Sequence, residues 1–184
     1  MKSKHVKTLM VPLSEYAVVS EDTNLFEAVL ALEKAQAEYE KSRYTHRAIL
    51  VRGENGKITG KLSQLDVLMG LEPKYKKIGE MKSISNLGFS AGFLKDLLAQ
   101  YRFWDEPMSD ICKKAQKIRV KEIMYAPMEG EIVDEAATLD QAIHQLVMGK
   151  HQSLLVTSKG DIVGILRLVD VFKEVFEQIQ ACTI

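Results

Sequence analysis

The chain has 184 residues, of which 46% are apolar and 27% are charged, a composition typical of a globular protein and unlike that of a disordered one. Its 25 Lys and Arg residues are balanced by 25 Asp and Glu residues, so the net charge is zero. This balance argues against a protein that binds nucleic acid or anionic membranes, because such proteins carry an excess of basic residues. No apolar run approaches the roughly 20 residues of a spanning helix, and the N-terminus lacks the apolar stretch of a signal peptide. We therefore expect a soluble, cytoplasmic protein.

The sequence contains none of the common catalytic or metal-binding motifs. Its two cysteines, Cys112 and Cys182, are too few for a disulfide framework and are not spaced as metal ligands. The four histidines are scattered, and there is no HExxH pair, no CxxC pair, no GxSxG turn and no GxxxxGK phosphate loop. We therefore expect neither a metal site nor an enzyme.

An internal repeat is the most informative feature of the sequence. The segment VKTLM at residues 6–10 returns as VKEIM at residues 120–124, which is 114 residues further on. Later identities occur at offsets of 105 and 104, because the first copy contains two small insertions. They include His46 with His151 and Asp66 with Asp170. So many identities in register indicate a duplication.

Both copies predict the same order of elements. A short extended entry leads to a helix that starts at Asn24 or Thr138, each followed three residues later by Glu or Gln, as in a capping box. A second helix opens near Ser63 or Arg167, after two strands joined by a turn that contains glycine. The strands are expected at 48–51 and 57–62 in the first copy and at 153–156 and 161–166 in the second. A unit of about 60 residues is marginally stable alone, so we expect the two copies to share a core.

Two segments have no counterpart in the other copy. Nine extra residues in the first copy, near 33–44, most simply lengthen its first helix. A longer insert, about 73–118, separates the copies and contains close to half of the aromatic residues. Ser90 is placed to cap a helix in it that carries Phe93. The insert is interpreted either as a helical segment packed over the core or as a surface for a protein partner or a dimer.

The segments GKLSQLD at 60–66 and GILRLVD at 164–170 each end a strand and begin a helix. In the first, the Ser63 hydroxyl is placed to accept a backbone N–H, and Asp66 lies at the positive end of the helix dipole. This is sufficient as a purely structural cap. The same geometry also suits a ligand, because free N–H groups and a hydroxyl bind an anion and a carboxylate accepts from a sugar diol.

His46 and Arg47 come just before the first strand of the same copy. An Arg side chain offers a fork of donors that matches phosphate, and a His side chain adds another donor, more strongly when protonated. The repeat alignment places this pair one hairpin away from Ser63. We therefore expect four polar groups to converge: His46, Arg47, Ser63 and Asp66.

The two copies resemble tandem cystathionine-β-synthase (CBS) domains, a pair known as a Bateman module. The resemblance covers residues 4–72 and 118–180. It rests on the VKxLM and VKxIM entry segments, the capped helix, the strand pair with its glycine turn, and the GxxSxxD motif that ends the second strand and begins the second helix. It implies an α+β fold in which two pseudo-symmetric repeats, each a helix, a strand pair and a helix, pack through their sheets. The helical insert, 73–117, lies outside the resemblance.

The resemblance also implies a regulatory module with two clefts between the repeats. Such clefts commonly bind AMP, ADP, ATP or S-adenosylmethionine, and pairs of modules often form flat dimers. Carried over to this sequence, Asp66 takes the ribose hydroxyls, while Ser63, His46 and Arg47 take phosphate. The base lies against the entry segment of the other copy, at Ala126, Glu131 and Ile132.

The second cleft departs from the family pattern. Asp170 and His151 are kept as candidate residues of this cleft, but Arg167 replaces the Ser or Thr, and Gln152 replaces the Arg that follows the His. Arg167 either grips a phosphate or fills the cleft with its bulk. The base-side wall of this cleft is expected from Pro12 to Val18 and includes Ala17.

We therefore expect a non-catalytic sensor of adenine nucleotides that requires no cofactor, forms a homodimer and has no nucleic-acid or membrane partner. One alternative is a ligand-free scaffold for dimerisation or partner docking, which the aromatic insert and the structural interpretation of the Ser63 cap favour. The other alternative is an enzyme that uses the cleft. Against it stands the lack of a nucleophile and base near the motif.

Overall fold

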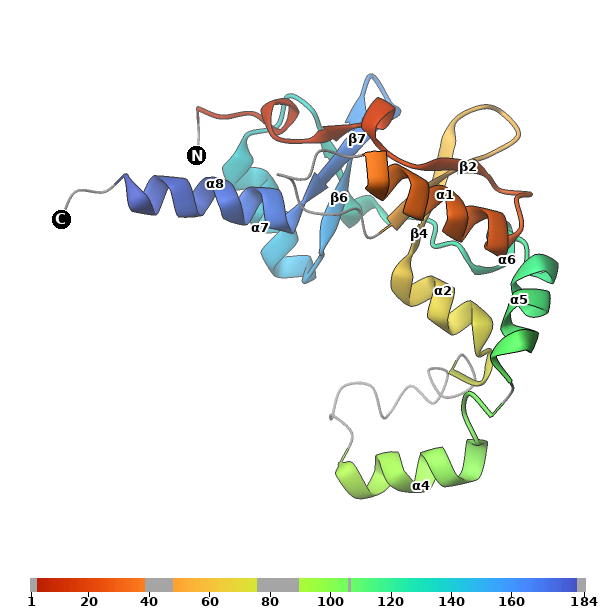
Figure 1. The fold of residues 1–184 in the computed structure, drawn as a ribbon. Helices are drawn as coiled ribbons and strands as arrows, with labels where there is room; N and C mark the ends of the chain where they lie inside the picture. The colour runs from red at the N-terminus through yellow and green to blue at the C-terminus, as the bar shows by residue number, and fades with distance from the viewer. Residues whose placement is uncertain (1–2, 39–47, 76–89, 106, 182–184) are drawn as a thin grey trace.

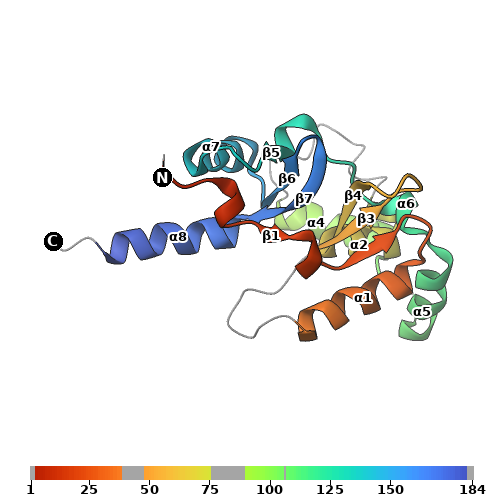
Figure 2. The ribbon, with the colours of Figure 1, turned by 90° about the horizontal axis from the view of Figure 1, so that it is seen from above.

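The computed structural model describes residues 3–38, 48–75, 90–105 and 107–181 (Figure 1). It is an α+β structure with one three-stranded sheet and one four-stranded sheet. The expected fold class is thus confirmed. Figure 2 shows the strands of both copies in the middle of the molecule, with α7 and α1 on opposite sides.

Each sheet is built mainly from one copy of the repeat. The first sheet has the order β2-β3-β4, and the second has the order β1-β7-β6-β5. The elements of the first copy are β2 (Val18–Ser20), α1 (Leu25–Glu38), β3 (Ala48–Arg52), β4 (Ile58–Ser63) and α2 (Gln64–Leu71). Those of the second are β5 (Ile132–Asp134), α7 (Leu139–Gly149), β6 (Ser153–Ser158), β7 (Asp161–Arg167) and α8 (Leu168–Gln180). The short strand β1 (Val11–Pro12) crosses from the first copy to pair with β7.

The local signals in the sequence form as expected. The backbone N–H of Glu27 donates to Asn24 Oδ1 at 2.9 Å, which caps α1. Gly56 and Gly160 have φ of +78° and +87° in the two strand-joining turns, where glycine adopts a left-handed conformation at little cost. Helix α1 has 14 residues and α7 has 11, so the first helix is longer as predicted. The rest of the extra segment, 39–47, lies outside the described residues.

The entry segments are exchanged between the copies. The N–H of Val6 donates to the carbonyl of Ala137 at 2.9 Å, and the fully buried Val6 side chain joins the core of the second copy. Conversely, the N–H of Val120 donates to the carbonyl of Thr23 at 2.9 Å, and Val120 is buried in the core of the first copy. The repeat alignment assigns each entry to its own copy, whereas the structure packs it on the other. The two copies therefore interlock.

Two equivalent glycines allow this exchange. A Cβ at Gly60 would lie 2.9 Å from the carbonyl oxygen of Tyr125, and one at Gly164 would lie 2.5 Å from that of Val11. Such distances are too short for a carbon contact with a backbone oxygen. Only glycine therefore lets the entry segment of one copy cross the second hairpin strand of the other without displacing it.

A small core is shared by the two sheets. Leu50 and Leu155, which occupy equivalent places in the two copies, are 0% and 1% exposed. They pack with residues from both copies: Val11, Tyr16 and Ile165. Burial of these side chains stabilises the packing of the two copies against each other. Such a shared core is needed because each unit alone is too small to be more than marginally stable.

The insert contains helices α4 (Ala91–Tyr101) and α5 (Met108–Lys117), and the short helix α6 (Val120–Ile123) begins the second copy. The N–H of Phe93 donates to Ser90 Oγ at 3.2 Å, so Ser90 caps α4 as predicted. Helix α5 packs on α1 and α2 and buries Ala115 in the core of the first copy. Figure 1 shows α4 beyond the far end of α2. The insert is thus helical and covers the core through α5.

The aromatic residues of the insert pack where α2 ends. The rings of Tyr75 and Phe103 stack with centroids 4.6 Å apart, and Trp104 Nε1 donates to the Tyr75 hydroxyl at 3.0 Å. The backbone N–H of Trp104 donates to Glu72 Oε2 at 3.0 Å. Burial alone raises the pKa of Glu72, but hydrogen bonds from the N–H groups of Trp104 and Lys74 and the Lys74 charge bring the pKa below its usual value. These contacts tie the insert to the C-terminal end of α2.

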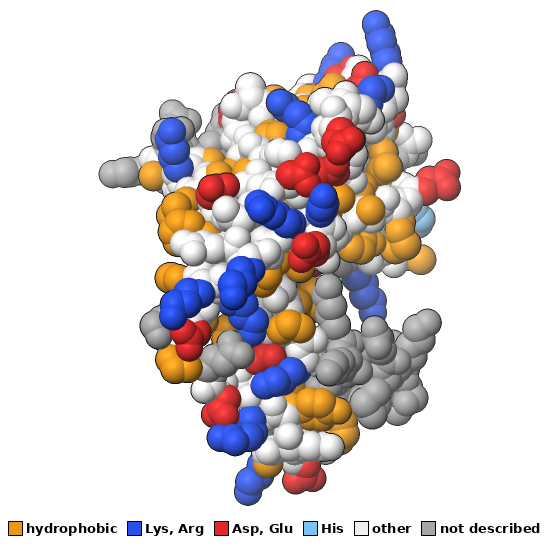
Figure 3. All heavy atoms as spheres, turned by 90° about the vertical axis from the view of Figure 1, so that its right-hand side faces the viewer, with side chains coloured by type: hydrophobic (Ala, Val, Ile, Leu, Met, Phe, Trp, Pro, Cys, Tyr) orange, Lys and Arg blue, Asp and Glu red, His pale blue; other side chains and the backbone are white. Residues whose placement is uncertain are grey.

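Charges of both signs are interspersed on the face seen in Figure 3, in keeping with the zero net charge. Surface ion pairs join the copies, and in one of them Lys121 Nζ lies 2.6 Å from Asp22 Oδ1. The hydrogen bond from Lys121 lowers the pKa of Asp22, and the same bond raises the pKa of Lys121. None of the helices in the described part of the chain has the length and apolarity needed to cross a membrane.

Candidate functional site

The N-terminus of α2 carries the first pair of predicted site residues. Ser63 precedes the helix, and its backbone N–H and hydroxyl donate to Asp66 Oδ2 at 2.8 and 2.6 Å. In return, the N–H of Asp66 donates to Ser63 Oγ at 3.2 Å. The structural cap expected from the sequence is therefore present. Both side chains remain partly exposed, so the cap does not remove them from reach of a ligand.

The strand that ends at Ser63 lies against the second copy. Lys61 and Tyr125 form an antiparallel bridge in which each backbone N–H donates to the other carbonyl, at 3.0 and 2.8 Å. This bridge brings the segment that follows Tyr125 to the strand that carries Ser63. Segments 61–66 and 125–132, from different copies, thus lie side by side, and we take them as the two walls of one candidate site.

A charged cluster joins these walls. Lys61 Nζ lies 3.0 Å from Glu131 Oε1, and the side chains of Lys61 and Glu131 are 14% and 8% exposed. The Lys61 ammonium also lies 5.5 Å from the centroid of the Tyr125 ring, within the range of a cation–π contact. The N–H of Met128 donates to Glu131 Oε2 at 3.3 Å, and His151 Nδ1 lies 3.7 Å from Glu131 Oε1. Glu131 is therefore the centre of a cluster that spans both copies.

Electrostatics in the cluster favour an ionised Glu131. Burial raises the pKa of Glu131, but hydrogen bonds from Lys61, the Tyr125 hydroxyl and the Met128 N–H outweigh it and leave the pKa below its usual value. The same bond to Glu131, together with burial and the charges of Glu131 and Asp66, raises the pKa of Tyr125. Asp66 thus acts electrostatically on the cluster across the seam between the copies.

The structure places the residues predicted for the first site as follows. Ser63 and Asp66 form one wall, and Glu131 reaches that wall through Lys61. Ala126 is exposed on the other wall, and Ile132 is the partly buried first residue of β5. His46 and Arg47 lie outside the described residues. The predicted convergence of four polar groups is therefore seen only for the Ser63 and Asp66 pair.

Sequence reasoning missed Lys61 and Tyr125. Lys61 was nevertheless visible, because it lies two residues before Ser63 inside the GKLSQLD motif, and residues two apart on a strand share a face. Nothing in the sequence indicated Tyr125. Its position depends on the crossing of the entry segment over β4, which is a tertiary feature.

His151 lies with the first candidate site and not with the second, where it was predicted. Strands β5 and β6 pair in parallel, with Ile132 opposite Leu155. This pairing places the short turn before β5 next to the residues before β6, so the His151 imidazole comes to lie beside Glu131. We therefore assign His151 to the Glu131 cluster.

In the second cleft, two of the predicted residues, Arg167 and Asp170, bind each other. Arg167 Nε and Nη2 lie 2.5 and 2.8 Å from the two oxygens of Asp170. Pro12 pairs with Gly164 across β1 and β7, while Val18 belongs to β2 and pairs with Leu50. Ala17 is 7% exposed. Within this predicted wall, Pro12 and Val18 are partly buried strand residues, while Leu13–Glu15 form a short 3-10 helix in which Ser14 and Glu15 are exposed.

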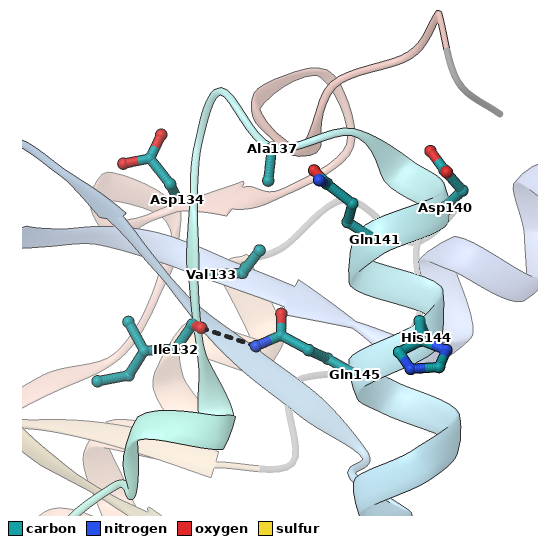
Figure 4. Close-up of a pocket in the computed structure, with 8 residues that line it drawn as sticks. All are labelled: Ile132, Val133, Asp134, Ala137, Asp140, Gln141, His144 and Gln145. Atoms are coloured by element: carbon teal, nitrogen blue, oxygen red, sulfur yellow. Dashed lines mark hydrogen bonds between the residues drawn. The ribbon is translucent and has the colours of Figure 1, made fainter.

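A hollow of about 590 Å³ lies elsewhere, between β5 and α7 (Figure 4). Gln145 reaches across it, and its Nε2 donates to the carbonyl of Ile132 at 3.1 Å. The other lining residues are Val133, Asp134, Ala137, Asp140, Gln141 and His144. Of the predicted site residues only Ile132 lines it. In the described ranges no three His, Cys, Asp or Glu side chains are grouped to hold a metal ion.

The fold and the seam define a class of protein: a module of two interlocked repeats, each with a capped helix, a hairpin and a second helix. Comparison with protein-family models gives the family. The CBS domain model matches residues 6–72 and 120–177. The chain belongs to the CBS-domain family, and its two matches make it a tandem CBS protein. Proteins of this family are in general regulatory modules without catalytic activity.

Solved structures agree with this fold. A CBS domain-containing protein of unknown function from Bacillus anthracis is 17% identical, with a TM-score of 0.64 over 96% of each chain. The CBS-pair protein CBSX2 from Arabidopsis thaliana is also 17% identical, with a TM-score of 0.59 over 97% of this chain and 98% of its own. A structure of CBSX2 in complex with AMP is 19% identical, with a TM-score of 0.59 over 95% and 98%. No curated protein sequence matches closely enough to count as a relative.

Proposed function

We propose that the chain is a non-catalytic regulatory module that binds an adenine nucleotide, or another adenosyl ligand, between its two CBS repeats. The binding site is the seam where Ser63 and Asp66 of the first copy face segment 125–132 of the second. The observation that carries this proposal is the contact of Lys61 with Glu131, because it brings the motif wall against the other copy. The AMP complex of CBSX2, a protein of the same fold, supports the choice of ligand.

The groups on the first wall suit the parts of a nucleotide. The N–H groups that open the eight-residue helix α2 and the Ser63 hydroxyl are donors for a phosphate. Asp66 is an acceptor for the two ribose hydroxyls. To take them, Asp66 exchanges the Ser63 hydroxyl for the sugar and keeps the backbone N–H of Ser63. The Ser63 hydroxyl is then free to donate to the phosphate.

The second wall provides the base side and a nearby cation. Ala126, which is exposed, and Ile132, which is partly buried, are the apolar residues that we assign to the adenine side. Lys61 stands between this wall and Ser63, held by Glu131. A ligand in this position contacts both copies at once. It therefore favours those conformations in which the copies are correctly placed, which is how binding here regulates.

A panel of ligands in a thermal unfolding experiment tests this function. The panel contains AMP, ADP, ATP and S-adenosylmethionine, with GMP as the control for the base. A ligand at 100 times its dissociation constant stabilises a protein by about 2.7 kcal/mol. For a chain of this size we expect an increase in midpoint of about 5–10 °C.

Each other outcome of the panel favours an alternative function. An unchanged midpoint with every adenosyl compound contradicts the proposal and favours the ligand-free scaffold. Conversion of the bound nucleotide, followed by chromatography, favours the enzyme. An equal shift with GMP contradicts the adenine specificity.

We also propose that the chain forms a homodimer through α2 and α8. Leu68 on α2 and Phe172 on α8 occupy equivalent positions in the two copies and are 50% and 65% exposed. Phe176 and Ile179 extend this apolar stripe along α8. Exposed apolar side chains at helical spacing on two pseudo-symmetric helices suit a surface that pairs with a second copy of itself.

Light scattering after size exclusion tests the dimer. Phe172→Glu places a charge in the stripe, and we expect it to convert a dimer of about twice the chain mass into a monomer. The control is Val147→Glu on α7, because Val147 is 64% exposed but lies on another helix. A wild-type chain that elutes as a monomer overturns this part of the proposal, as does an equal effect of both variants.

A further inference from the structure

Arg167 stands in the second copy where Ser63 stands in the first. Its Nε and Nη2 contact different oxygens of Asp170, at 2.5 and 2.8 Å, so the pair is bidentate. The Arg167 side chain is 7% exposed and that of Asp170 is 17% exposed. Bidentate guanidinium–carboxylate pairs are among the strongest polar contacts in proteins, especially away from water.

A second Arg–Asp pair in the chain, which is exposed, shows by comparison how burial protects the contact from water. Arg102 and Asp105 have the same spacing of three residues, and Arg102 Nη2 lies 2.8 Å from Asp105 Oδ2. Their side chains are 75% and 52% exposed, so water screens and competes for this contact. The Arg167–Asp170 pair is protected from such competition. A ligand has to displace the guanidinium from both oxygens of Asp170 before it can use them.

The wall opposite Arg167 is apolar, whereas the corresponding wall of the first cleft is polar. In the first cleft, Lys61 and Tyr125 face Glu131. At the equivalent places in the second cleft the chain has Ile165, Val11 and Ala17, which are 1%, 3% and 7% exposed. Val11 and Ile165 are part of the core shared by the two sheets. The polar seam of the first cleft is thus replaced in the second by packed apolar side chains.

The β6–β7 ladder continues into the first residue of α8. The N–H of Leu168 donates to the carbonyl of Gln152 at 3.0 Å. Gln152 itself replaces the Arg of the first copy, so the side chain that faces phosphate in the family is absent from this position.

We propose that Arg167 closes the second cleft by acting as a built-in substitute for the ligand. Its guanidinium occupies both oxygens of Asp170, whose counterpart Asp66 takes the ribose in the first cleft. The chain consequently binds one nucleotide and not two, and removal of the Arg167 side chain opens a second nucleotide site. The ligand class in this statement rests on the proposed function.

Isothermal titration with AMP measures the number of sites. We expect the wild-type chain to bind one AMP and Arg167→Ser, which restores the Ser of the first motif, to bind two. Arg102→Ser is the matched control and is expected to bind one. A wild-type chain that binds two AMP molecules overturns the proposal. So does an Arg167→Ser variant that binds AMP at one site only.

A measurement without nucleotide separates this proposal from the proposed function. Hydrogen exchange of the arginine Nε–H groups in the wild-type chain is followed by NMR, with assignment by Arg167→Lys and Arg102→Lys. We expect the Arg167 Nε–H to exchange at least tenfold more slowly than that of Arg102. Equal rates overturn the closed cleft even if AMP binds. If neither the wild type nor any variant binds AMP, the proposed function fails. Slow exchange of the Arg167 Nε–H still establishes that Arg167 is held on Asp170.

Discussion

Replacement of Asp66 by alanine is expected to weaken AMP binding by about 30- to 150-fold. The carboxylate is the proposed acceptor for both ribose hydroxyls, and hydrogen bonds to a charged group contribute about 2–3 kcal/mol when a ligand loses them. The variant also loses the two bonds from Ser63, so the start of α2 becomes less well ordered as a phosphate site. Isothermal titration of the wild-type and variant chains measures the change.

The helix cap has to be separated from the ligand role. Gln141 occupies the equivalent capping position on α7, where its Oε1 accepts from the N–H of Thr138 at 3.0 Å. Gln141→Ala therefore removes a comparable cap on a different helix and costs about 1 kcal/mol of stability. We expect it to bind AMP as the wild type does. Unchanged affinity in Asp66→Ala contradicts the ribose assignment, and equal losses in both variants indicate a purely structural cap.

Replacement of Glu131 by alanine is expected to destabilise the chain by about 3–5 kcal/mol. The variant leaves the ammonium of Lys61 in a largely buried place without its carboxylate, and an uncompensated buried charge is strongly unfavourable. It also removes the acceptor for the Met128 N–H. Urea unfolding followed by circular dichroism gives the free energy of unfolding for comparison with the wild type.

Two further variants test whether burial of the Lys61–Glu131 pair is the reason for this loss of stability. The Lys57–Asp161 pair is 2.7 Å long, but its side chains are 65% and 58% exposed, so we expect Asp161→Ala to cost less than about 1 kcal/mol. The double variant Lys61→Met with Glu131→Leu removes both buried charges together and is expected to recover most of the stability. A loss in Glu131→Ala no larger than in Asp161→Ala refutes the buried bridge.

The Glu131 cluster also makes the stability of the fold depend on pH. Because the pKa of Glu131 is lower in the folded chain than in the unfolded chain, the ionised carboxylate stabilises the fold at pH values above its unfolded pKa, about 4.3. This contribution is lost as the pH falls through the lower, folded pKa. The wild type should therefore lose more stability than Glu131→Ala over this acidic range, and parallel curves would contradict the assignment.

Much of the local structure was predictable from the sequence. The repeat showed where the helices, hairpins and glycine turns lie, because caps, periodicity and positive φ depend on residues close together in the chain. Asn24, Ser63 and Ser90 cap their helices as predicted. The resemblance carried by the entry segments, the capped helix, the strand pair and the GxxSxxD motif was sufficient to predict the tandem CBS fold, which the family match confirms.

Only the wall of the candidate site that carries Ser63 and Asp66 was predictable from the sequence. Ser63 and Asp66 belong to a single local motif, so their spacing alone places them together. The partners of that motif come from the other copy, and no local signal encodes them. His151 shows the difference: alignment grouped it with Arg167, while the parallel pairing of β5 with β6 places it beside Glu131.

The sequence by itself determined that this chain is a duplicated module and where its capped motif lies, since both depend on short-range order and on internal identity. The tertiary structure decided that the entry segments exchange, that Lys61 meets Glu131 across the seam and that Arg167 turns onto Asp170. The physical reason is the same in each case. Burial and pairing between strands far apart in the chain select among contacts that the local sequence allows equally.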